Sequence, residues 1–359
     1  KIYKFSYKIK SLIKEGDRVL LLSENRPEWL IADLAIMNAG GITVPIFTTY
    51  AERDYEYILK DCSPSLIVVS NDIQFEKINK FIDNQEIISF EKIKTSSITS
   101  ESIFNEKYEK TINDKLNRKL PACIIYTSGT SGNPKGVILS HGGILSNCEG
   151  ALELLQPLIK RKEPIFLTWL PLSHSYEHTV QMIQILIGAK VFYAESLEKL
   201  ISNMGVAKPT IMTAVPRFYQ NLFTKINMNF QKQKGLKKSL INKTLTLGKK
   251  TLDKNQMTFF EKIQNLICQL LVRKKIRNQF GGNLQAFVSG GGALDKNVGE
   301  FLNAIGLPTL QGYGLTETSP VVSCNLPNLV KVDTVGPPFR TNEVQIASDG
   351  EILIRGENV

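Results

Sequence analysis

Short apolar runs alternate with amphipathic segments in the first part of the chain. Residues 18–23, 42–47 and 66–69 are apolar runs with the length of buried strands. Residues 27–37 begin with a proline and then place apolar side chains at helical spacing, and residues 52–61 follow as a second helical segment. Strand, helix and strand in succession, with short connections, predict a parallel sheet with helices on its faces.

A second series of apolar runs follows a polar stretch. Residues 94–119 have no clear periodic pattern, and we expect them to form a linker. Further strands are expected, with helical patterns between them, at residues 122–126, 165–170, 191–193, 211–215, 286–288 and 309–310. Near the end, the apolar patterns at 343–346 and 351–354 flank an Asp-Gly pair, which predicts a β-hairpin.

These patterns predict an α/β protein in three parts. We expect a first α/β subdomain at residues 1–115, a second at 116–328, and the start of a small β-rich module at 329–359. Within the second part, residues 221–280 lack strand signals and are predicted to form a helical insert. The expected fold is therefore two parallel-sheet αβα subdomains followed by a β-rich segment.

Composition and cysteine use narrow the class of protein. A hydrophobic content of 42% and a charged content of 22% are ordinary for a globular protein. No apolar run reaches the ~18 residues of a membrane-spanning helix. The five cysteines are an odd number without Cys-x-x-Cys spacing, which argues against a disulfide framework and a cysteine zinc site. We therefore expect a reducing compartment, most simply the cytoplasm.

One segment carries the whole excess of positive charge. Residues 221–280 contain 14 basic and two acidic residues, a balance of +12, whereas the rest of the chain has 30 basic and 32 acidic residues. Lysines interleaved with apolar residues favour peripheral contact with an anionic membrane, on its cytoplasmic face. The alternative is a solvated helical insert. Nucleic-acid binding is not expected, because the segment has no recognisable motif for it.

A Ser/Gly-rich loop is the clearest candidate for chemistry. Residues 126–136 read YTSGTSGNPKG and follow a predicted strand. Glycines allow backbone N–H groups to turn toward an anion, hydroxyls add donors, and Lys135 supplies a positive charge. A flexible surface turn is the alternative. Because Lys135 is followed by Gly136, the segment is not a Walker A motif.

Two further glycine-containing loops follow predicted strands. Residues 311–318 read QGYGLTET, in which flanking glycines suit stacking of Tyr313 on a flat ligand and Glu317 suits Mg²⁺. The alternative is a strand-to-helix turn in which Thr316 caps a helix. Residues 289–295 read SGGGALD, and there Asp295 is expected to cap the next helix.

A histidine pair suggests a different class of enzyme. His174, Glu177 and His178 match a reversed zinc-peptidase motif. The only other histidine is His141, and no downstream glutamate stands out as a third ligand. Zinc peptidase activity is therefore a remote alternative.

Together these segments resemble the adenylate-forming acyl-CoA synthetase superfamily, and within it the long-chain fatty acid–CoA ligase branch. Residues 126–136 are similar to the family's phosphate loop, 170–174 to its Leu-Pro-Leu-x-His segment, and 312–320 to its adenine- and magnesium-binding segment. Residues 215–218, the helical insert and residues 281–290 indicate the branch. The resemblance spans essentially the whole chain.

The resemblance implies a two-step reaction. A long-chain fatty acid reacts with ATP to give acyl-AMP and pyrophosphate, and a thiol, usually that of CoA, then displaces AMP. ATP and Mg²⁺ are the expected cofactors and CoA the co-substrate. The large N-terminal domain of adenylate-forming enzymes is the expected fold.

The resemblance also implies roles for individual residues. The ATP phosphates would be held by Thr127, Ser128, Gly129, Thr130, Ser131, Gly132 and Lys135. Further nucleotide contacts are expected from Gly291, Gln311, Gly312, Tyr313 and Thr316, the last at the α-phosphate. Thr130 and Glu317 would hold Mg²⁺, and His174 would lie near the acyl carboxylate. The residues expected to carry the catalysis are Lys135, His174, Thr316 and Glu317.

Some family features do not occur in this sequence. Family members carry a later Thr-Gly-Asp segment and a small C-terminal domain with a lysine that drives adenylation. We therefore expect a fragment, most of the large N-terminal domain, which would be inactive or weakly active alone. Two alternatives stay open: a ligase that loads acyl carrier protein, and, of another class, a non-catalytic ATP- or acyl-binding module.

Overall fold

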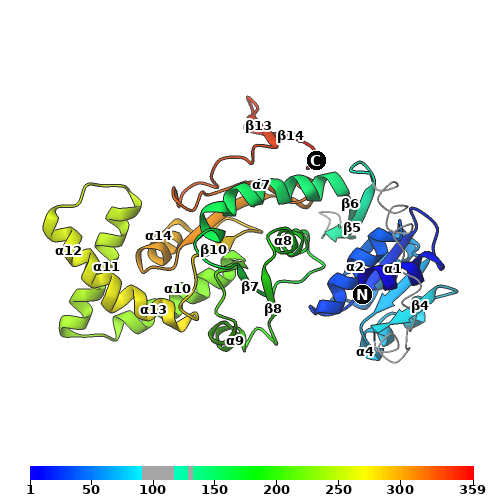
Figure 1. Ribbon diagram of the computed structural model, residues 1–359, viewed down its shortest axis with the longest axis horizontal. Coiled ribbons are helices and arrows are strands. Elements are labelled where there is room, and N and C mark those ends of the chain that lie inside the picture. The colour runs from blue at the N-terminus through cyan, green and yellow to red at the C-terminus, as the bar shows by residue number, and fades with distance from the viewer. Residues whose placement is uncertain (91–116, 128–131) are drawn as a thin grey trace.

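A computed structural model of the chain describes residues 1–90, 117–127 and 132–359. Within these ranges the chain forms two six-stranded sheets and a separate two-stranded sheet. The first sheet lies at one end of the molecule and the second sheet near its middle, each with helices beside it (Figure 1). The α/β class and the expected combination of two mostly parallel sheets with a small β-rich segment are confirmed.

The first sheet contains the strands predicted near the start of the chain. Its order is β4-β3-β1-β2-β5-β6, and all neighbours are parallel except β5 and β6. The strands are β1 (Arg18–Leu22), β2 (Ile42–Ile46), β3 (Leu66–Val69), β4 (Glu86–Ser89), β5 (Pro121–Thr127) and β6 (Lys135–Ser140). The helical elements are α1 (Ile2–Lys10), α2 (Pro27–Asn38), α3 (Glu52–Cys62), α4 (Asp72–Glu76) and η1 (Asn79–Phe81).

The prediction that places the two strands that follow residue 116 in the second subdomain is wrong, because they belong to the first sheet. In β5, Cys123 pairs in parallel with Thr43 of β2, so β5 and its antiparallel neighbour β6 extend the first sheet. The side chains of β5 pack on both sides, Tyr126 with the core of the first sheet and Ile125 with α7 and α8. An apolar run predicts a buried strand but not its neighbour, because pairing depends on tertiary contacts.

The second sheet has the order β12-β11-β10-β9-β7-β8 and is parallel except for β11 and β12. Its strands are β7 (Ile165–Thr168), β8 (Lys190–Tyr193), β9 (Ile211–Ala214), β10 (Ala286–Ser289), β11 (Thr309–Gly314) and β12 (Val321–Cys324). The accompanying helical elements are α7 (His141–Ile159), α8 (Ser175–Leu186), α9 (Leu200–Ala207), α14 (Lys296–Ala304) and η4 (Thr316–Thr318).

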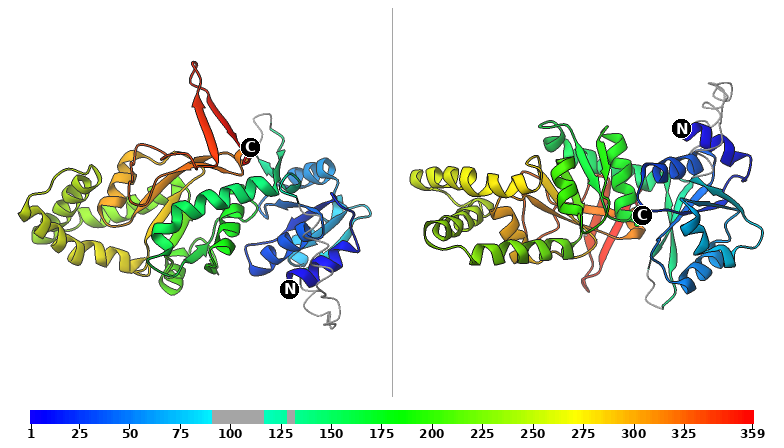
Figure 2. Two further views of the ribbon diagram at one scale, coloured as in Figure 1. Left: turned by 45° about the horizontal axis from the view of Figure 1, so that its top comes forward. Right: turned by 90° about the horizontal axis from the view of Figure 1, so that it is seen from below.

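The basic segment is helical, as predicted. It contains α10 (Pro216–Gln231), α11 (Gly235–Leu252), α12 (Phe259–Cys268), the π-helical turn η3 (Gln269–Arg273) and α13 (Lys274–Gln279). These helices project from the second sheet at the end of the molecule away from the first sheet (Figure 2). The buried guanidinium of Arg273 donates to the carbonyl oxygens of Ala304 and Thr244, which joins the segment to α14. Among the described helices, none combines the length and apolar character required to span a bilayer.

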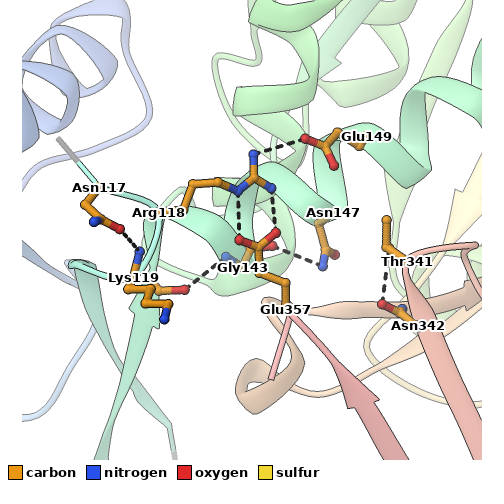
Figure 3. Close-up of polar contacts among 10 residues, drawn as sticks. Asn117, Arg118, Lys119, Gly143, Asn147, Glu149, Thr341, Asn342 and Glu357 are labelled. Carbon is orange, nitrogen blue, oxygen red and sulfur yellow. Dashed lines mark hydrogen bonds and ion pairs between the residues drawn. The ribbon is translucent and has the colours of Figure 1, made fainter. Parts of the chain in front are cut away.

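The predicted hairpin is also present. β13 (Asn342–Ile346) pairs antiparallel with β14 (Ile352–Gly356). Just after β14, Glu357 receives two hydrogen bonds from Arg118, at 2.7 and 2.6 Å, and Arg118 also contacts Glu149 of α7 at 3.2 Å (Figure 3). The end of the hairpin is thereby connected to the start of β5 and to α7.

Candidate functional site

A cavity of about 1100 Å³ lies between α7, α8 and the second sheet. The carboxyl ends of β10 and β11, with the loops that follow them, form one part of its wall. In open α/β sheets this edge is where ligands bind, because the loops at strand ends are free to vary around a rigid sheet. The geometry therefore marks the cavity as the candidate site.

The glycine-rich loop after β10 is held in place by Gln311. The Gln311 Oε1 atom accepts a 2.6 Å hydrogen bond from the backbone N–H of Leu294, and its Nε2 donates to the Thr334 carbonyl at 3.2 Å. At Gly290, a Cβ atom would approach the Tyr176 ring to 2.9 Å, and Gly291 has a positive φ of +77°. The loop therefore requires glycine for both packing and backbone conformation.

The turn after β11 contacts the start of α8. The hydroxyls of Thr316 and Ser175 lie 3.1 Å apart. Thr316 begins the short turn η4 and does not cap a longer helix. Asp295, by contrast, accepts a hydrogen bond from the Val298 N–H and caps α14, as expected.

His174 is the residue that precedes α8. Its Nδ1 accepts a 3.1 Å hydrogen bond from the backbone N–H of Tyr176, and its side chain borders the cavity. The surrounding protein lowers the pKa of His174 below its ordinary value, because desolvation disfavours the imidazolium. With Nδ1 accepting, the neutral ring carries its proton on Nε2, where it is available as a donor.

The other part of the cavity wall is apolar. It is formed by side chains from α7, α8, β7 and β9. These residues are Ala151, Leu154, Leu155, Phe166, Val180, Ile183 and Ile211. The cavity therefore has polar loops on one side and an aliphatic and aromatic surface on the other.

The Ser/Gly-rich loop connects β5 to β6 in the first sheet. Thr127, the last residue of β5, pairs with Lys135, the first residue of β6. Lys135 is exposed, and Gly132 has a φ of +94°. The predicted phosphate contacts at Ser128, Gly129, Thr130 and Ser131 lie outside the described residues.

The structure brings together some of the predicted site residues and not others. The cavity is bordered by His174, Gly291, Gln311, Gly312, Tyr313 and Thr316. Outside its lining lie Thr127, Gly132, Lys135 and the exposed Glu317. The two groups are connected, since β6 contacts η4, the turn that contains Thr316 and Glu317.

The zinc-peptidase motif does not form a metal site. His178 is fully buried and its Nε2 lies 3.0 Å from Asp33, whereas the buried Glu177 accepts a hydrogen bond from Thr213. In the ranges that the structure covers, no group of three or more metal-ligating side chains occurs. Both residues are core residues of α8.

Several residues that shape the cavity were not predicted from the sequence. Ser175 is one of them, and the only indication of its role in the sequence is that it directly follows His174. The segment 332–336 also borders the cavity, although it has neither a glycine-rich pattern nor a recognisable motif. Its position is a consequence of the contacts that Gln311 and Asn325 make with the carbonyl of Thr334.

Glycine-rich loops at the carboxyl edge of a mostly parallel sheet, beside a cavity whose other wall is apolar, define a ligand-binding α/β protein. The family is then given by comparison: a family model described as AMP-binding enzyme matches residues 10–359. The chain belongs to the AMP-binding enzyme family.

Curated relatives include long-chain fatty acid–CoA ligases. The chain is 30% identical over 356 residues to the long-chain-fatty-acid–CoA ligase FadD15 of Mycobacterium bovis, covering 96% of this chain and 59% of the relative. It is 28% identical to fatty acyl-CoA synthetase A of Dictyostelium discoideum, covering 97% of this chain and 55% of the relative. The chain thus spans somewhat more than half of each relative's length.

Solved structures with the same fold include O-succinylbenzoate coenzyme A synthetase from Bacillus subtilis in complex with AMP. That structure has a TM-score of 0.70 at 18% identity and covers 100% of this chain and 79% of its own. VinN has a TM-score of 0.69 at 17% identity, covering 100% of this chain and 81% of its own. At these identities the likeness establishes the fold.

Proposed function

We propose that this chain forms the nucleotide- and acyl-binding part of an enzyme that activates a long-chain fatty acid with ATP and transfers the acyl group to CoA. The single observation that carries the proposal is the two-sided cavity, with polar glycine-rich loops on one side and an apolar wall on the other. The names of the relatives, CoA ligase and acyl-CoA synthetase, support CoA as the acceptor.

The size and lining of the cavity suit an amphiphilic ligand. Its volume of about 1100 Å³ is slightly above the range of about 300–1,000 Å³ that is usual for small-molecule pockets. Burying an aliphatic chain against the apolar wall contributes about 0.8 kcal/mol for each CH₂ group. A long-chain fatty acid therefore gains more from this cavity than a short acid does.

The chemistry needs positioning and charge neutralisation more than a general base. A fatty carboxylate is already ionised at pH 7, so its oxygen can attack the α-phosphorus directly. The new carboxylate–phosphorus bond forms as the bond to the bridging oxygen breaks, and pyrophosphate leaves with the electron pair. In this proposal His174 donates from Nε2 to an oxygen of the carboxylate or the adenylate, and Thr316 donates to the α-phosphate.

The phosphate and adenine contacts complete the proposed nucleotide site. Gln311, Gly312 and Tyr313 would frame adenine, with Gly291 beside them. The outer phosphates would be bound by residues 127–132 and Lys135, where backbone N–H groups, hydroxyls and an ammonium group provide donors. The contact between β6 and η4 supports placing these two sets of residues on one nucleotide.

Glu317 fits a role in holding Mg²⁺. It is an exposed carboxylate on the turn η4, directly after Thr316. Mg²⁺ in nucleotide sites is bound through one or two protein oxygens together with substrate phosphates. Glu317 and the hydroxyl of Thr130 would be those ligands, and the ion would neutralise charge on the triphosphate.

The test is fatty acid–dependent exchange of pyrophosphate into ATP by the full-length protein. A series of acids from acetate to stearate should show kcat/KM rising with chain length. Equal activity with acetate and palmitate, or no exchange with any acid, would overturn the proposal.

A variant of the apolar wall sharpens this test. Ala151→Phe fills the cavity from α7, so kcat/KM for palmitate should fall at least about tenfold, while octanoate changes less than about threefold. The matched control is Val206→Phe at an exposed position of α9, which should change neither value. A parallel loss with both acids would assign Ala151 to folding and not to the acyl site.

A further inference from the structure

The outermost helix of the basic segment exposes its apolar side. α12, η3 and α13 follow one another without interruption, and α12 lies at the end of the molecule away from the first sheet (Figure 1). Seven large apolar side chains of α12 and η3 recur at helical spacing and are exposed, whereas Val272 and Ile276 of the same run are buried in the core. The seven exposed residues are Phe259, Phe260, Ile263, Leu266, Ile267, Leu270 and Leu271. Phe259 and Phe260 are the most exposed, at 73% and 75%.

The run contacts the rest of the protein through the buried Cys268, Val272 and Ile276 and, in α12, through polar side chains. Glu261 forms a capping box with Thr258 and receives two hydrogen bonds from Lys250, at 2.9 and 2.8 Å. The side chain of Asn265 accepts a 2.7 Å hydrogen bond from Arg273. A surface helix normally places its apolar stripe on the core and its polar side in water. Here seven large apolar side chains lie in water instead, which is the mark of an interaction surface.

Positive charge surrounds the exposed apolar side chains. The exposed lysines on this run and the loop before it are Lys254, Lys262, Lys274 and Lys275. From residue 254 to 279 the sequence contains one acidic residue, Glu261, and Lys250 already pairs with it at 2.8 Å. The surface therefore combines apolar side chains with an unbalanced positive charge.

Three other lysines of the basic segment have protein partners. Lys249 pairs with Glu300 at 2.8 Å, and Lys250 pairs with Glu261. Lys238 donates to the carbonyl oxygen of Phe230 and to the side chain of Gln231. These contacts stabilise the helical segment itself, so only a part of its positive charge is directed outward.

We propose that α12 and η3 dock on an anionic lipid bilayer, with the helix axis along the interface and the phenylalanines inserted. An amphipathic helix with aromatic and aliphatic residues on one side and lysines around them suits the boundary between headgroups and acyl chains. Two copies of the chain meeting through this surface would place lysines opposite lysines, whereas an anionic bilayer complements their charge.

The surface is separate from the proposed active site. None of the seven exposed apolar residues, nor any of the four lysines, is among the residues that border the cavity. Docking can therefore be tested without reference to activity, and it can fail while the proposed function holds.

The experiment is co-sedimentation of the full-length protein with vesicles of phosphatidylcholine alone or with about a third phosphatidylserine, over a salt series. Binding to the anionic vesicles should be at least about tenfold tighter and should weaken as salt rises. Two variants should each weaken this binding by about tenfold or more. One carries Phe259→Ser together with Phe260→Ser, and the other carries Lys→Gln at positions 254, 262, 274 and 275 together.

Matched controls distinguish this surface from general charge or stickiness. Leu197→Ser with Val206→Ser removes equally exposed apolar side chains elsewhere and should leave binding unchanged. Lys→Gln at the exposed positions 14, 119, 160 and 331 removes the same amount of charge and should have a much smaller effect. Pyrophosphate exchange with octanoate, a soluble acid, should be the same for the parent and all of these variants.

A site-specific probe reports insertion directly. Phe259→Trp should show blue-shifted fluorescence with anionic vesicles and no shift with neutral ones. Equal binding to both vesicle types, or binding that survives both the phenylalanine and the lysine changes, would overturn the proposal. Concentration-dependent dimerisation that Phe259→Ser with Phe260→Ser abolishes would also overturn it, because the surface would then join two copies of the chain.

Discussion

Glu177 lies in α8 with its carboxyl group enclosed by the core. Its Oε2 accepts a 2.8 Å hydrogen bond from the Thr213 hydroxyl, and Tyr193 is a near neighbour. Burial raises the pKa of Glu177 to about 7, because desolvation penalises the carboxylate more than the Thr213 contact favours it. The residue that suggested a zinc peptidase is therefore a buried acid at a position next to the cavity wall.

Glu177→Gln should change how stability depends on pH. Since the native pKa of about 7 exceeds the ordinary value of 4.5, the native state binds more protons than the unfolded state between these values. The free energy of unfolding of the parent should therefore fall as pH rises from about 4.5 to about 7, and the variant should lack this loss. Urea denaturation between about pH 4 and pH 8 should show a relative gain for the variant of as much as about 3 kcal/mol.

The exposed Glu86 at the start of β4 provides the control, and Glu86→Gln should follow the parent at every pH. Parallel curves for the parent and Glu177→Gln would contradict the assignment of a raised pKa.

Glu317→Gln should abolish adenylation in the full-length enzyme. The carboxylate follows Thr316 on η4, and under the proposed function it holds Mg²⁺, so its loss would weaken charge neutralisation in the transition state. Fatty acid–dependent pyrophosphate exchange should fall at least about a hundredfold, or ~2.7 kcal/mol. Activity within about threefold of the parent would show that Glu317 has no role in holding the metal.

Lys135→Ala should raise KM for ATP more than KM for fatty acid. Lys135 begins β6, is exposed, and lies outside the lining of the cavity that holds the proposed acyl site. Its charge should therefore act on the outer phosphates. Steady-state kinetics with each substrate varied in turn would decide, and equal effects on both KM values would count against a phosphate contact.

At the scale of elements, the close pairing of β11 with β12 sets the position of the turn η4. A Cβ atom at Gly314 would come within 1.8 Å of the Pro320 carbonyl oxygen, which real structures do not tolerate. The Leu315 N–H donates to the same carbonyl at 3.0 Å. Thr316 and Glu317 are held where they are because glycine permits this approach.

Gly314→Ala should therefore destabilise the protein by about 2 kcal/mol or more, since backbone must move to accept the methyl group. Urea denaturation of the purified protein measures the change. Gly205→Ala in α9 is the matched control, because its Cβ meets nothing within 4 Å. It should be neutral or stabilising by about 0.5–1 kcal/mol through helix propensity. Equal effects of the two substitutions would disprove the steric argument.

At the scale of the whole molecule, the contacts of Arg118 connect three parts of the fold. Figure 3 shows its guanidinium between Glu357, which follows the hairpin, and Glu149 of α7. Arg118 also holds the pKa of Glu357 below its usual range, through the hydrogen bonds that favour the carboxylate. The position of the hairpin relative to β5 depends in part on this pair.

A double-mutant cycle between Arg118→Ala and Glu357→Ala should give a favourable coupling of about 0.5–1 kcal/mol, the upper part of the range for partly exposed pairs, because the contact is bidentate. Denaturation of the parent, both single variants and the double variant measures it. The coupling should decrease in high salt. A coupling indistinguishable from zero at low salt would show that the hairpin is held by other contacts.

The local sequence pattern was sufficient to predict many of the helices and strands of this molecule. The strands at residues 18–22 and 42–46, the helices between them, the hairpin around Asp349 and the helical character of 221–280 follow from spacing, turn residues and propensity, which act between near neighbours in the chain. The motif around Tyr313 likewise indicated the loop that borders the cavity, because glycines at strand ends have few other uses.

Tertiary structure alone decided the features that depend on distant contacts. β5 joins the first sheet because Cys123 pairs with Thr43. Glu177 and His178 face the core because Thr213 and Asp33 contact them there. The side of α12 that meets water is likewise set by contacts with distant parts of the chain. The same spacing of apolar and polar residues fits a helix whose apolar side packs on the core and one whose apolar side is exposed. Periodicity shows that a helix has an apolar side, but not what that side contacts. Side-chain burial and strand pairing exist only once the chain has folded. The cavity and the exposed apolar surface therefore also exist only in the folded protein.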